Sequence, residues 1–263
     1  MSPVDIAQLA LNYADLNKDN MHREPREHAT SWHAHELCRA CGSCILTGKR
    51  SEYCPGKLRP DQITLLDDGT WGPARNIISF TGGDLACQPE FYAKAAKEIK
   101  NLERDLLVLY ETNGYGLTHR NLDLFKVAGI DSFWLDIKAY DDKIHRRLTG
   151  ASNKWILKLP AEILNRGFVL EVLSLYIPGW VETDQIGKIA ELLAGVEPAI
   201  PFTILAFFPE HKMLKVPPPN FQQMIEAFHA ARAAGLKNIR LGNIGMFAKT
   251  VKEYRTLKML GAI

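Results

Sequence analysis

The sequence IISFTGGDLACQPEF, residues 77–91, decides the fold of this chain. An apolar, β-branched run ends in the pair Gly82-Gly83 and Asp84, and a helical repeat of apolar residues starts near Pro89. This order predicts a buried strand, a tight turn and a helix. Glycines at the carboxyl end of a strand let the backbone approach a ligand closely without strain. In α/β proteins ligands bind at that end of the sheet, although an ordinary strand-to-helix turn also explains the glycine pair.

The alternation of strand and helix continues along the rest of the chain. Strands are predicted at residues 77–81, 106–111, 132–137, 169–177, 202–208 and 238–241, with helical patterns between most of them. Strands that alternate with helices form a parallel sheet with right-handed crossovers. Because six strands are too few for a closed eight-stranded barrel, we expect an α/β fold built as a partial (β/α)6 TIM-like barrel or an open sheet.

The first part of the chain is less regular. One helix is predicted at about residues 3–16, followed by a polar, histidine-bearing stretch and then by a segment rich in cysteine, glycine and basic residues. We therefore expect three parts: a leader at residues 1–37, a metal-binding segment at 38–60 and an α/β domain at 61–263.

Composition excludes several classes of partner. The 263 residues include 32 Lys and Arg against 30 Asp and Glu, a net charge of +2, which gives no reason to expect nucleic acid or an anionic membrane. No apolar run approaches the length of about 18 residues that a membrane span needs, and the start of the chain lacks a signal-peptide core. An odd number of cysteines, five, argues against a disulfide framework. A cytoplasmic protein is the expectation.

Four cysteines form the second organising feature. Cys38, Cys41, Cys44 and Cys54 follow the pattern C-x2-C-x2-C-x9-C. A spacing of two residues lets neighbouring thiolates converge on one metal centre, and soft thiolate ligands suit an iron–sulfur cluster or zinc. The fifth, Cys87, is expected to be a small buried apolar residue.

Polar residues gather where the predicted strands end. Glu111 and Thr112 follow the second strand, and Asp136 and Lys138 close the third. Residues two apart on a strand point to the same face, so this carboxylate and ammonium project together. Burying them without a ligand or partner would be costly, and the pattern predicts a site for a polar small molecule. The nearby run of His145, Arg146 and Arg147 is expected to be a solvated helix face, with a protein contact as the alternative.

Taken together, these motifs resemble those of the radical S-adenosylmethionine (SAM) enzymes. The resemblance covers about residues 76–247 and is nearest to the pyruvate formate-lyase activating enzymes and the AmmeMemoRadiSam-type proteins. It rests on the order and spacing of FTGGDLACQPEF, ETNGYG, FWLDIKAYDDKIHRRLTG, LYIPGW, ILAFFPEHKM and GLKNIRLGN.

The resemblance implies a role for each strand end. The methionyl amino group of SAM would be received by Gly82, Gly83 and Asp84, with aspartate in place of the usual glutamate. The D-x-K strand would contact the ribose or carboxylate of SAM through Asp136, Ile137 and Lys138. By the same resemblance, a monovalent cation would lie near the SAM carboxylate, surrounded by Glu111, Thr112 and Asp136.

The implied chemistry is radical chemistry. In such enzymes a [4Fe-4S] cluster passes an electron to SAM, and the resulting 5′-deoxyadenosyl radical abstracts a hydrogen atom, which in the activating enzymes comes from a glycine of a protein substrate. An electron donor such as flavodoxin or ferredoxin is implied as a second partner.

The chain departs from the family pattern in three places. The usual C-x3-C-x2-C motif is absent, no clear strand precedes Cys38, and Phe208 stands where the activating enzymes have a histidine. The segment CRACGSCILTGKRSEYCPGKLR is more similar to an ancillary four-cysteine element found ahead of the radical motif in some AmmeMemoRadiSam-type relatives. In that case the usual first strand–helix unit and the catalytic cluster loop would be absent.

Two assignments of the cysteines therefore stay open. In the first, Cys38, Cys41 and Cys44 hold the catalytic cluster and leave one iron open for SAM. In the second, Cys54 completes a closed zinc or iron–sulfur site, and the barrel is a non-catalytic binding module. A protein that binds SAM without cleaving it is a third, weaker possibility.

Overall fold

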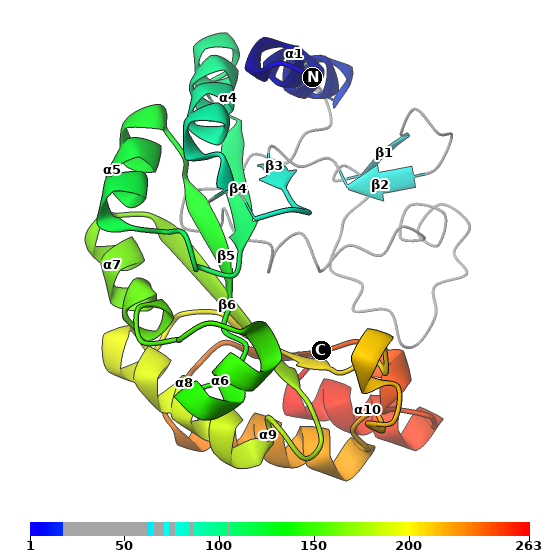
Figure 1. The fold of residues 1–263 in the computed structure, drawn as a ribbon. Coiled ribbons are helices and arrows are strands. Elements are labelled where there is room, and N and C mark those ends of the chain that lie inside the picture. Colours follow the sequence, from blue (N-terminus) through cyan, green and yellow to red (C-terminus); the bar gives the residue numbers. More distant parts are fainter. Residues whose placement is uncertain (18–62, 66–70, 74–76, 85–86, 105) are drawn as a thin grey trace. The chain divides into compact units, whose positions relative to one another are not determined.

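The computed structural model describes residues 1–17, 63–65, 71–73, 77–84, 87–104 and 106–263 (Figure 1). Strands and helices alternate from residue 77 onward. In chain order the elements are α1 (Pro3–Asn17), β1 (Ile63–Leu65), β2 (Trp71–Pro73), β3 (Ile77–Phe80), α4 (Pro89–Leu102), β4 (Leu107–Thr112), α5 (His119–Ala128), β5 (Ser132–Asp136), α6 (Asp142–Thr149), η4 (Ile156–Lys158), α7 (Leu159–Asn165), β6 (Val169–Tyr176), α8 (Thr183–Val196), β7 (Phe202–Ala206), η5 (His211–Met213), α9 (Phe221–Ala233), β8 (Ile239–Gly242), η6 (Ile244–Met246) and α10 (Val251–Leu260).

Six strands form one sheet in the order β3-β4-β5-β6-β7-β8, which is also their order in the sequence. The parallel register aligns Ile77 with Leu107 at one end and Leu205 with Gly242 at the other. Each of the six predicted strands is confirmed, with ends that differ by at most two residues. The α/β class is therefore confirmed. Outside this sheet, β1 and β2 form a short antiparallel pair.

The described chain divides into two compact units. The first contains α1, α4, α5, β3 and β4, and its core is a row of aromatic rings in mostly edge-to-face contact. Tyr110 on β4 lies 4.8 Å from Phe80 and 5.8 Å from Phe125 between ring centroids, distances at which such pairs are stabilising. The Tyr110 hydroxyl donates a hydrogen bond of 2.5 Å to the carbonyl of Tyr92. The polar end of this buried ring is therefore satisfied.

One buried carboxylate joins three elements of the first unit. Asp131, just before β5, accepts a hydrogen bond of 2.8 Å from the Val108 amide of β4. It also forms an ion pair of 2.7 Å with Lys100 of α4. Buried charges persist where they are paired and hydrogen-bonded in this way.

The second unit holds α6, α8, α9 and α10, strands β7 and β8, almost all of β6, the start of α7 and the end of β5. Helices α8 and α9 pack side by side (Figure 1), and the apolar residues Ile186, Ile189 and Phe228 on these helices are fully buried. Asn220 and Gln223 form a capping box that starts α9, directly after the run of three prolines. In the part of the chain that the structure describes, no helix has both the length and the apolar character needed to cross a membrane.

Candidate functional site

The glycine turn after β3 has an unusual backbone. Gly82 has a φ of +109°, a conformation that side chains rarely adopt, and a Cβ atom built on Gly82 or Gly83 would meet no atom of the described residues within 4 Å. Glycine at position 82 is therefore required by the backbone, whereas the described residues leave room for a ligand beside both glycines. Next to the turn, the Asp84 carboxylate accepts a hydrogen bond of 2.9 Å from the Thr112 hydroxyl at the end of β4. This bond fixes Asp84 beside the turn.

The second strand end is held by hydroxyl groups of its neighbour. The Glu111 carboxylate of β4 accepts hydrogen bonds from Thr81, at 2.5 Å, and from Ser79, at 3.5 Å. The four residues Thr81, Asp84, Glu111 and Thr112 thus form one polar group at the carboxyl ends of β3 and β4, all within the first unit. Sequence reasoning predicted three of them and missed Thr81.

Asp136 and Lys138 project together from the end of β5, as their spacing predicts. The Lys138 ammonium donates to one carboxylate oxygen of Asp136. The other oxygen, Oδ1, is buried and has no hydrogen-bond partner among the described residues. Burial raises the pKa of the Asp136 carboxyl, because a charge is costly away from water, while Lys138 and then His145 oppose the rise.

Taken separately, the two strand ends carry groups whose chemistry suits different parts of SAM. The ribose hydroxyls and the methionyl ammonium of SAM are hydrogen-bond donors. The buried Oδ1 of Asp136 and the carboxylate of Asp84 are acceptors, and the open space at Gly82 and Gly83 admits close approach of a ligand. Asp84 belongs to the first unit and Asp136 to the second. The residues predicted to surround a monovalent cation, Glu111, Thr112 and Asp136, are divided in the same way, so that site stays a prediction.

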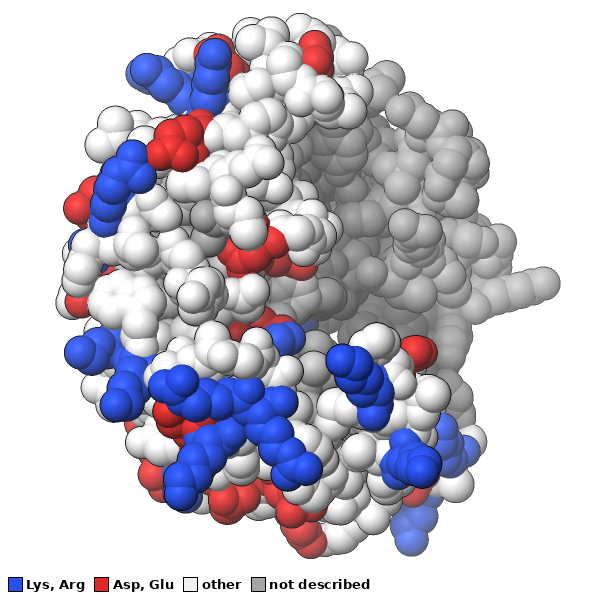
Figure 2. All heavy atoms as spheres, in the orientation of Figure 1, with Lys and Arg blue, Asp and Glu red and all other residues white. Residues whose placement is uncertain are grey.

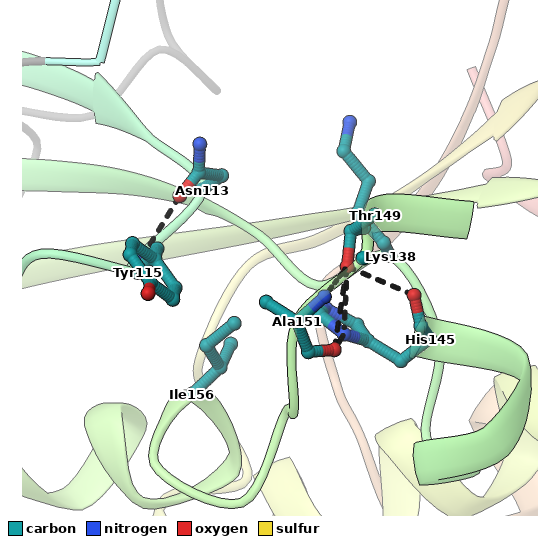
Figure 3. Close-up of a pocket in the computed structure, with 8 residues that line it drawn as sticks. Asn113, Tyr115, Lys138, His145, Thr149, Ala151 and Ile156 are labelled. Atoms are coloured by element: carbon teal, nitrogen blue, oxygen red, sulfur yellow. Dashed lines mark hydrogen bonds between the residues drawn. The ribbon is translucent and has the colours of Figure 1, made fainter. Parts of the chain in front are cut away.

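A cavity of about 460 Å³ lies within the second unit, beside Lys138 (Figure 3). Its described lining residues are Asn113, Tyr115, Lys138, His145, Thr149, Gly150, Ala151 and Ile156. His145 comes from α6 and is only 2% exposed, whereas Tyr115 is 71% exposed and stands at the rim. The cavity therefore combines a buried imidazole with an aromatic ring that solvent reaches.

Residues 139–153, which we call the α6 wall, form one side of this cavity. Asp141 caps the helix by accepting hydrogen bonds from the amides of Lys143 and Ile144. After the helix ends at Gly150, with φ at +82°, the chain turns back, and the His145 Nδ1 contacts the Ala151 carbonyl at 2.8 Å. The buried side chain of Asn153 donates to the carbonyls of Ala139 and Tyr140. The segment that follows Gly150 is thus hydrogen-bonded both to α6 and to the residues just before α6.

Asp142 is the hub of the α6 wall. Its carboxylate accepts hydrogen bonds from the Ser152 hydroxyl at 2.6 Å, the Asn153 amide at 3.0 Å and the Arg146 guanidinium at 2.8 Å. The bond from Ser152, followed by that from Arg146, holds the pKa of Asp142 far below its usual value. A carboxylate with a lowered pKa stabilises the folded state above the ordinary aspartate pKa, and this stabilisation is lost as the pH falls through the lowered value.

We expect Asp142→Asn to lower the melting temperature by a few degrees at pH 7 and to reduce the loss of stability below about pH 4, because the variant has no carboxylate to protonate there. Thermal unfolding followed by circular dichroism between pH 2 and pH 7 measures both effects. Glu191→Gln, at an exposed position on α8, serves as the control and should follow the parent protein. This role would be contradicted if the melting temperature of the Asp142→Asn variant fell below pH 4 as steeply as that of the parent protein.

Two expectations about single residues are wrong. Cys87 is exposed rather than buried, because it lies in the loop before α4 begins at Pro89. His145 is buried and bonded to Ala151 rather than solvated, while its neighbours Arg146 and Arg147 are exposed. Sequence reasoning did not predict that His145 lines the cavity. The only hint in the sequence was the position of this histidine, four residues before the helix end at Thr149 and Gly150.

The predicted cysteine ligands, Cys38, Cys41, Cys44 and Cys54, lie outside the described residues. Their donor chemistry, three or four thiolates, fits an iron–sulfur cluster. Within the described ranges, no three His, Cys, Asp or Glu side chains are grouped so that they could hold a metal ion.

Basic side chains gather on the surface that carries α6 (Figure 2). Lys143, Arg146 and Arg147 of this helix are exposed. The Arg147 guanidinium stacks over the ring of Trp180 at 4.1 Å, which fastens α6 to the turn after β6. Arg146 is paired with Asp142, so the positive charge of the surface is partly offset.

Known proteins share this fold. The solved structure of a domain of a pyruvate-formate lyase-activating enzyme from Bacteroides vulgatus matches with a TM-score of 0.53 and 21% identity, over 63% of this chain and 98% of that domain. Streptococcus suis SuiB bound to S-adenosylmethionine matches with a TM-score of 0.52 and 12% identity, over 64% of this chain and 39% of SuiB. These matches confirm the predicted partial barrel of the radical SAM type.

Sequence comparison identifies relatives of named activity. A protein of Methanocaldococcus jannaschii named as a glycyl-radical enzyme activating enzyme is 28% identical over 156 residues, 57% of each chain. The pyruvate formate-lyase 1-activating enzyme of Escherichia coli K12 is 25% identical over 161 residues, 56% of this chain and 64% of the enzyme. The chain thus spans less than two thirds of the length of these relatives. A family model described as the Radical SAM superfamily matches residues 39–193. The chain belongs to the radical SAM superfamily, whose members use a [4Fe-4S] cluster and SAM.

Proposed function

We propose that this chain is a radical SAM enzyme of the activating-enzyme type, which generates a radical on a protein substrate. The observation that carries the proposal is the strand end at Asp136, where a buried carboxylate oxygen has no partner among the described residues and a lysine is held beside it. A buried acceptor left without a donor is costly in a folded protein. A bound ligand with hydroxyl groups would remove that cost.

The residues of the chain would bind and orient SAM. Asp84, fixed by Thr112, would receive the methionyl ammonium beside Gly82 and Gly83, and Asp136 would accept from a ribose hydroxyl. Lys138 would offer its remaining ammonium hydrogens to the SAM carboxylate. When bound, the cluster and SAM supply the 5′-deoxyadenosyl radical that abstracts a hydrogen atom from the substrate.

The cysteine segment at residues 38–60 would hold the cluster, ahead of the α/β domain at 61–263. We assign Cys38, Cys41 and Cys44 as its ligands. Three thiolates would leave one iron open, as binding of SAM to the cluster requires, whereas ligation by Cys54 would close it. Helix α1 of the leader packs against α4, so we count it with the first unit.

The partners follow from the relatives. Several are named for activating another enzyme, among them the isethionate sulfite-lyase activating enzyme of Oleidesulfovibrio alaskensis, 27% identical over 175 residues, 61% of this chain and 54% of that enzyme. We therefore propose a protein substrate with a target glycine, an electron donor such as flavodoxin or ferredoxin, and a cytoplasmic location. Neither nucleic acid nor a membrane is needed for this activity.

The test is an anaerobic measurement on the reconstituted chain. Iron per chain is determined, and 5′-deoxyadenosine is measured after addition of dithionite and SAM. We expect about four irons per chain, as a [4Fe-4S] cluster requires, and formation of 5′-deoxyadenosine. Zinc in place of iron, or iron without SAM cleavage, would overturn the proposal and favour the alternative of a non-catalytic binding module with a closed four-cysteine site.

A further inference from the structure

Lys138, which the proposed function assigns to the carboxylate of SAM, lies beyond the end of its strand. Strand β5 ends at Asp136, so the backbone of Lys138 lies in the connection between β5 and α6. On the side of the sheet, the Ile137 amide donates a hydrogen bond of 3.0 Å to the Leu173 carbonyl of β6. On the other side, the position of Lys138 depends on how the next part of the connection, residues 139–141, is held.

Asn153 holds the first two residues of this connection. Its side-chain amide donates hydrogen bonds to the carbonyls of Ala139, at 2.9 Å, and Tyr140, at 2.6 Å. Asn153 is 1% exposed, and Ala139 is fully buried. A buried carbonyl that loses its donor is costly, so the connection would have to move toward water if this amide were removed.

The third residue of the connection is held from α8. The Asp141 amide donates a hydrogen bond of 2.8 Å to Oε1 of Gln185, a buried residue of that helix. Asn153 is itself anchored, because its backbone amide donates to the Asp142 carboxylate at 3.0 Å. Two buried amide side chains thus hold residues 139–141 at three points, and all of these residues belong to the second unit.

We propose that Asn153, supported by Gln185, is a positioning residue that directs the ammonium of Lys138 to the carboxylate of SAM. The inference rests on the proposed function, which places SAM at Lys138, and it adds residues that act through this lysine. A lysine has a long flexible stem, so its ammonium is directed by the place of its backbone and by its pair with Asp136. A shift of the connection would loosen that pair and spread the ammonium over several orientations.

The test compares the binding of SAM with that of decarboxylated SAM, which keeps the adenosine, the sulfonium and the amino group but lacks the carboxylate. Both ligands are titrated calorimetrically and anaerobically into the reconstituted full chain, without dithionite, so that SAM is not cleaved. The ratio of the two affinities reports the contacts of the carboxylate. Thermal unfolding of the same samples reports stability. A purely structural residue would change the melting temperature and leave the affinity ratio as it is in the parent chain.

Asn153→Leu keeps the approximate size of the side chain and removes its hydrogen-bond donors. We expect it to lower the affinity for SAM by about three- to tenfold, the usual worth of one hydrogen bond, and that for decarboxylated SAM by less than about twofold. Lys138→Met removes a charged donor and should lower the affinity ratio by about 10–100-fold. In the Lys138→Met background, Asn153→Leu should have no further effect on the ratio, because both changes act on the same contact.

Ser152→Ala is the matched control on the same loop. It removes a hydrogen bond of 2.6 Å to Asp142, so it should lower the melting temperature and keep the parent ratio. Gln185→Met removes the acceptor of the Asp141 amide and should lower the ratio in the same direction as Asn153→Leu. The inference would be overturned by an unchanged ratio in Asn153→Leu, or in Gln185→Met if the first variant does not fold. An equal loss of affinity for both ligands would overturn it as well.

The two proposals fail in different ways. If Lys138→Met lowers the ratio and Asn153→Leu does not, Lys138 contacts the carboxylate as proposed and the positioning role is wrong. If Lys138→Met leaves the ratio unchanged, the assignment of Lys138 in the proposed function is wrong, and the positioning role is wrong with it. Failure of the parent chain to bind SAM would overturn both proposals. Cleavage of SAM is decided independently, by the formation of 5′-deoxyadenosine.

Discussion

Replacing Cys41 by alanine is expected to abolish reductive cleavage of SAM. In the proposed assignment Cys41 is the central ligand of three, and loss of a thiolate removes a bond to iron that no neighbouring oxygen or nitrogen ligand replaces well. Mutation of a residue that only hydrogen-bonds to a metal ligand typically lowers metal affinity or activity about 10–100-fold. Loss of a ligand itself should therefore lower the rate of 5′-deoxyadenosine formation by at least about 100-fold. Iron content and 5′-deoxyadenosine are measured on the same reconstituted sample.

The chain offers two informative comparisons for this variant. Cys87 is an exposed free cysteine outside the predicted ligand set, so Cys87→Ala should keep both iron and activity and control for the loss of a thiol. Cys54→Ser decides between the two cysteine assignments. A three-cysteine cluster should tolerate it, whereas a closed four-cysteine site should lose metal. Retained SAM cleavage in Cys41→Ala would rule out Cys41 as a cluster ligand.

Gly114→Ala is expected to destabilise the second unit strongly. Gly114 has a φ of +77°, and a Cβ at this position would lie 2.6 Å from Leu159 Cδ1 and 2.8 Å from Leu135 Cδ1. Both leucines are fully buried, so they have little room to move. The left-handed backbone costs a non-glycine residue about 1–2 kcal/mol and overpacking about 1–3 kcal/mol, which together give about 2–5 kcal/mol. This is a large share of the usual stability of about 5–15 kcal/mol.

Urea unfolding at equilibrium measures this loss. Gly195→Ala is the matched control. Gly195 lies in α8, no described residue comes within 4 Å of its Cβ position, and its replacement should stabilise the protein by about 0.5–1 kcal/mol. Asn113 and Tyr115, on either side of Gly114, both line the cavity, so a backbone shift that relieves the clash should also change the shape of the cavity. An unfolding midpoint equal to that of the parent protein would show that Leu135 and Leu159 can repack.

Local patterns were sufficient to predict most of the fold. The six strands are short apolar runs bounded by turn residues, and strand periodicity placed Asp136 and Lys138 on one face, where they are paired. These features depend on residues one or two positions apart, so they can be read from the sequence. The glycine turn was predicted for the same reason, because Gly82 needs its positive φ whatever surrounds it.

The cavity could not be predicted in this way. His145 lies on a short helix between the half-buried Ile144 and the exposed Arg146. It is buried because the chain reverses at Gly150 and brings the Ala151 carbonyl to its ring. Whether that reversal occurs depends on the bonds that Asp142 makes to Ser152 and Asn153, which no periodicity encodes. Cys87 was predicted wrongly because apolar character alone does not say where a loop ends and a helix begins.

The α6 wall has a consequence for how the protein folds and diverges. The hydrogen bonds within the wall join residues at most 14 positions apart, the longest being between Asn153 and Ala139. Outside the wall, the Asp141 amide donates to Gln185 of α8. Closing such short loops costs little chain entropy, and local contacts of this kind form quickly during folding. The wall can therefore be in place before the long-range strand pairs are complete. Substitutions within these 15 residues can reshape one side of the cavity while the sheet that carries the strand-end carboxylates is left unchanged.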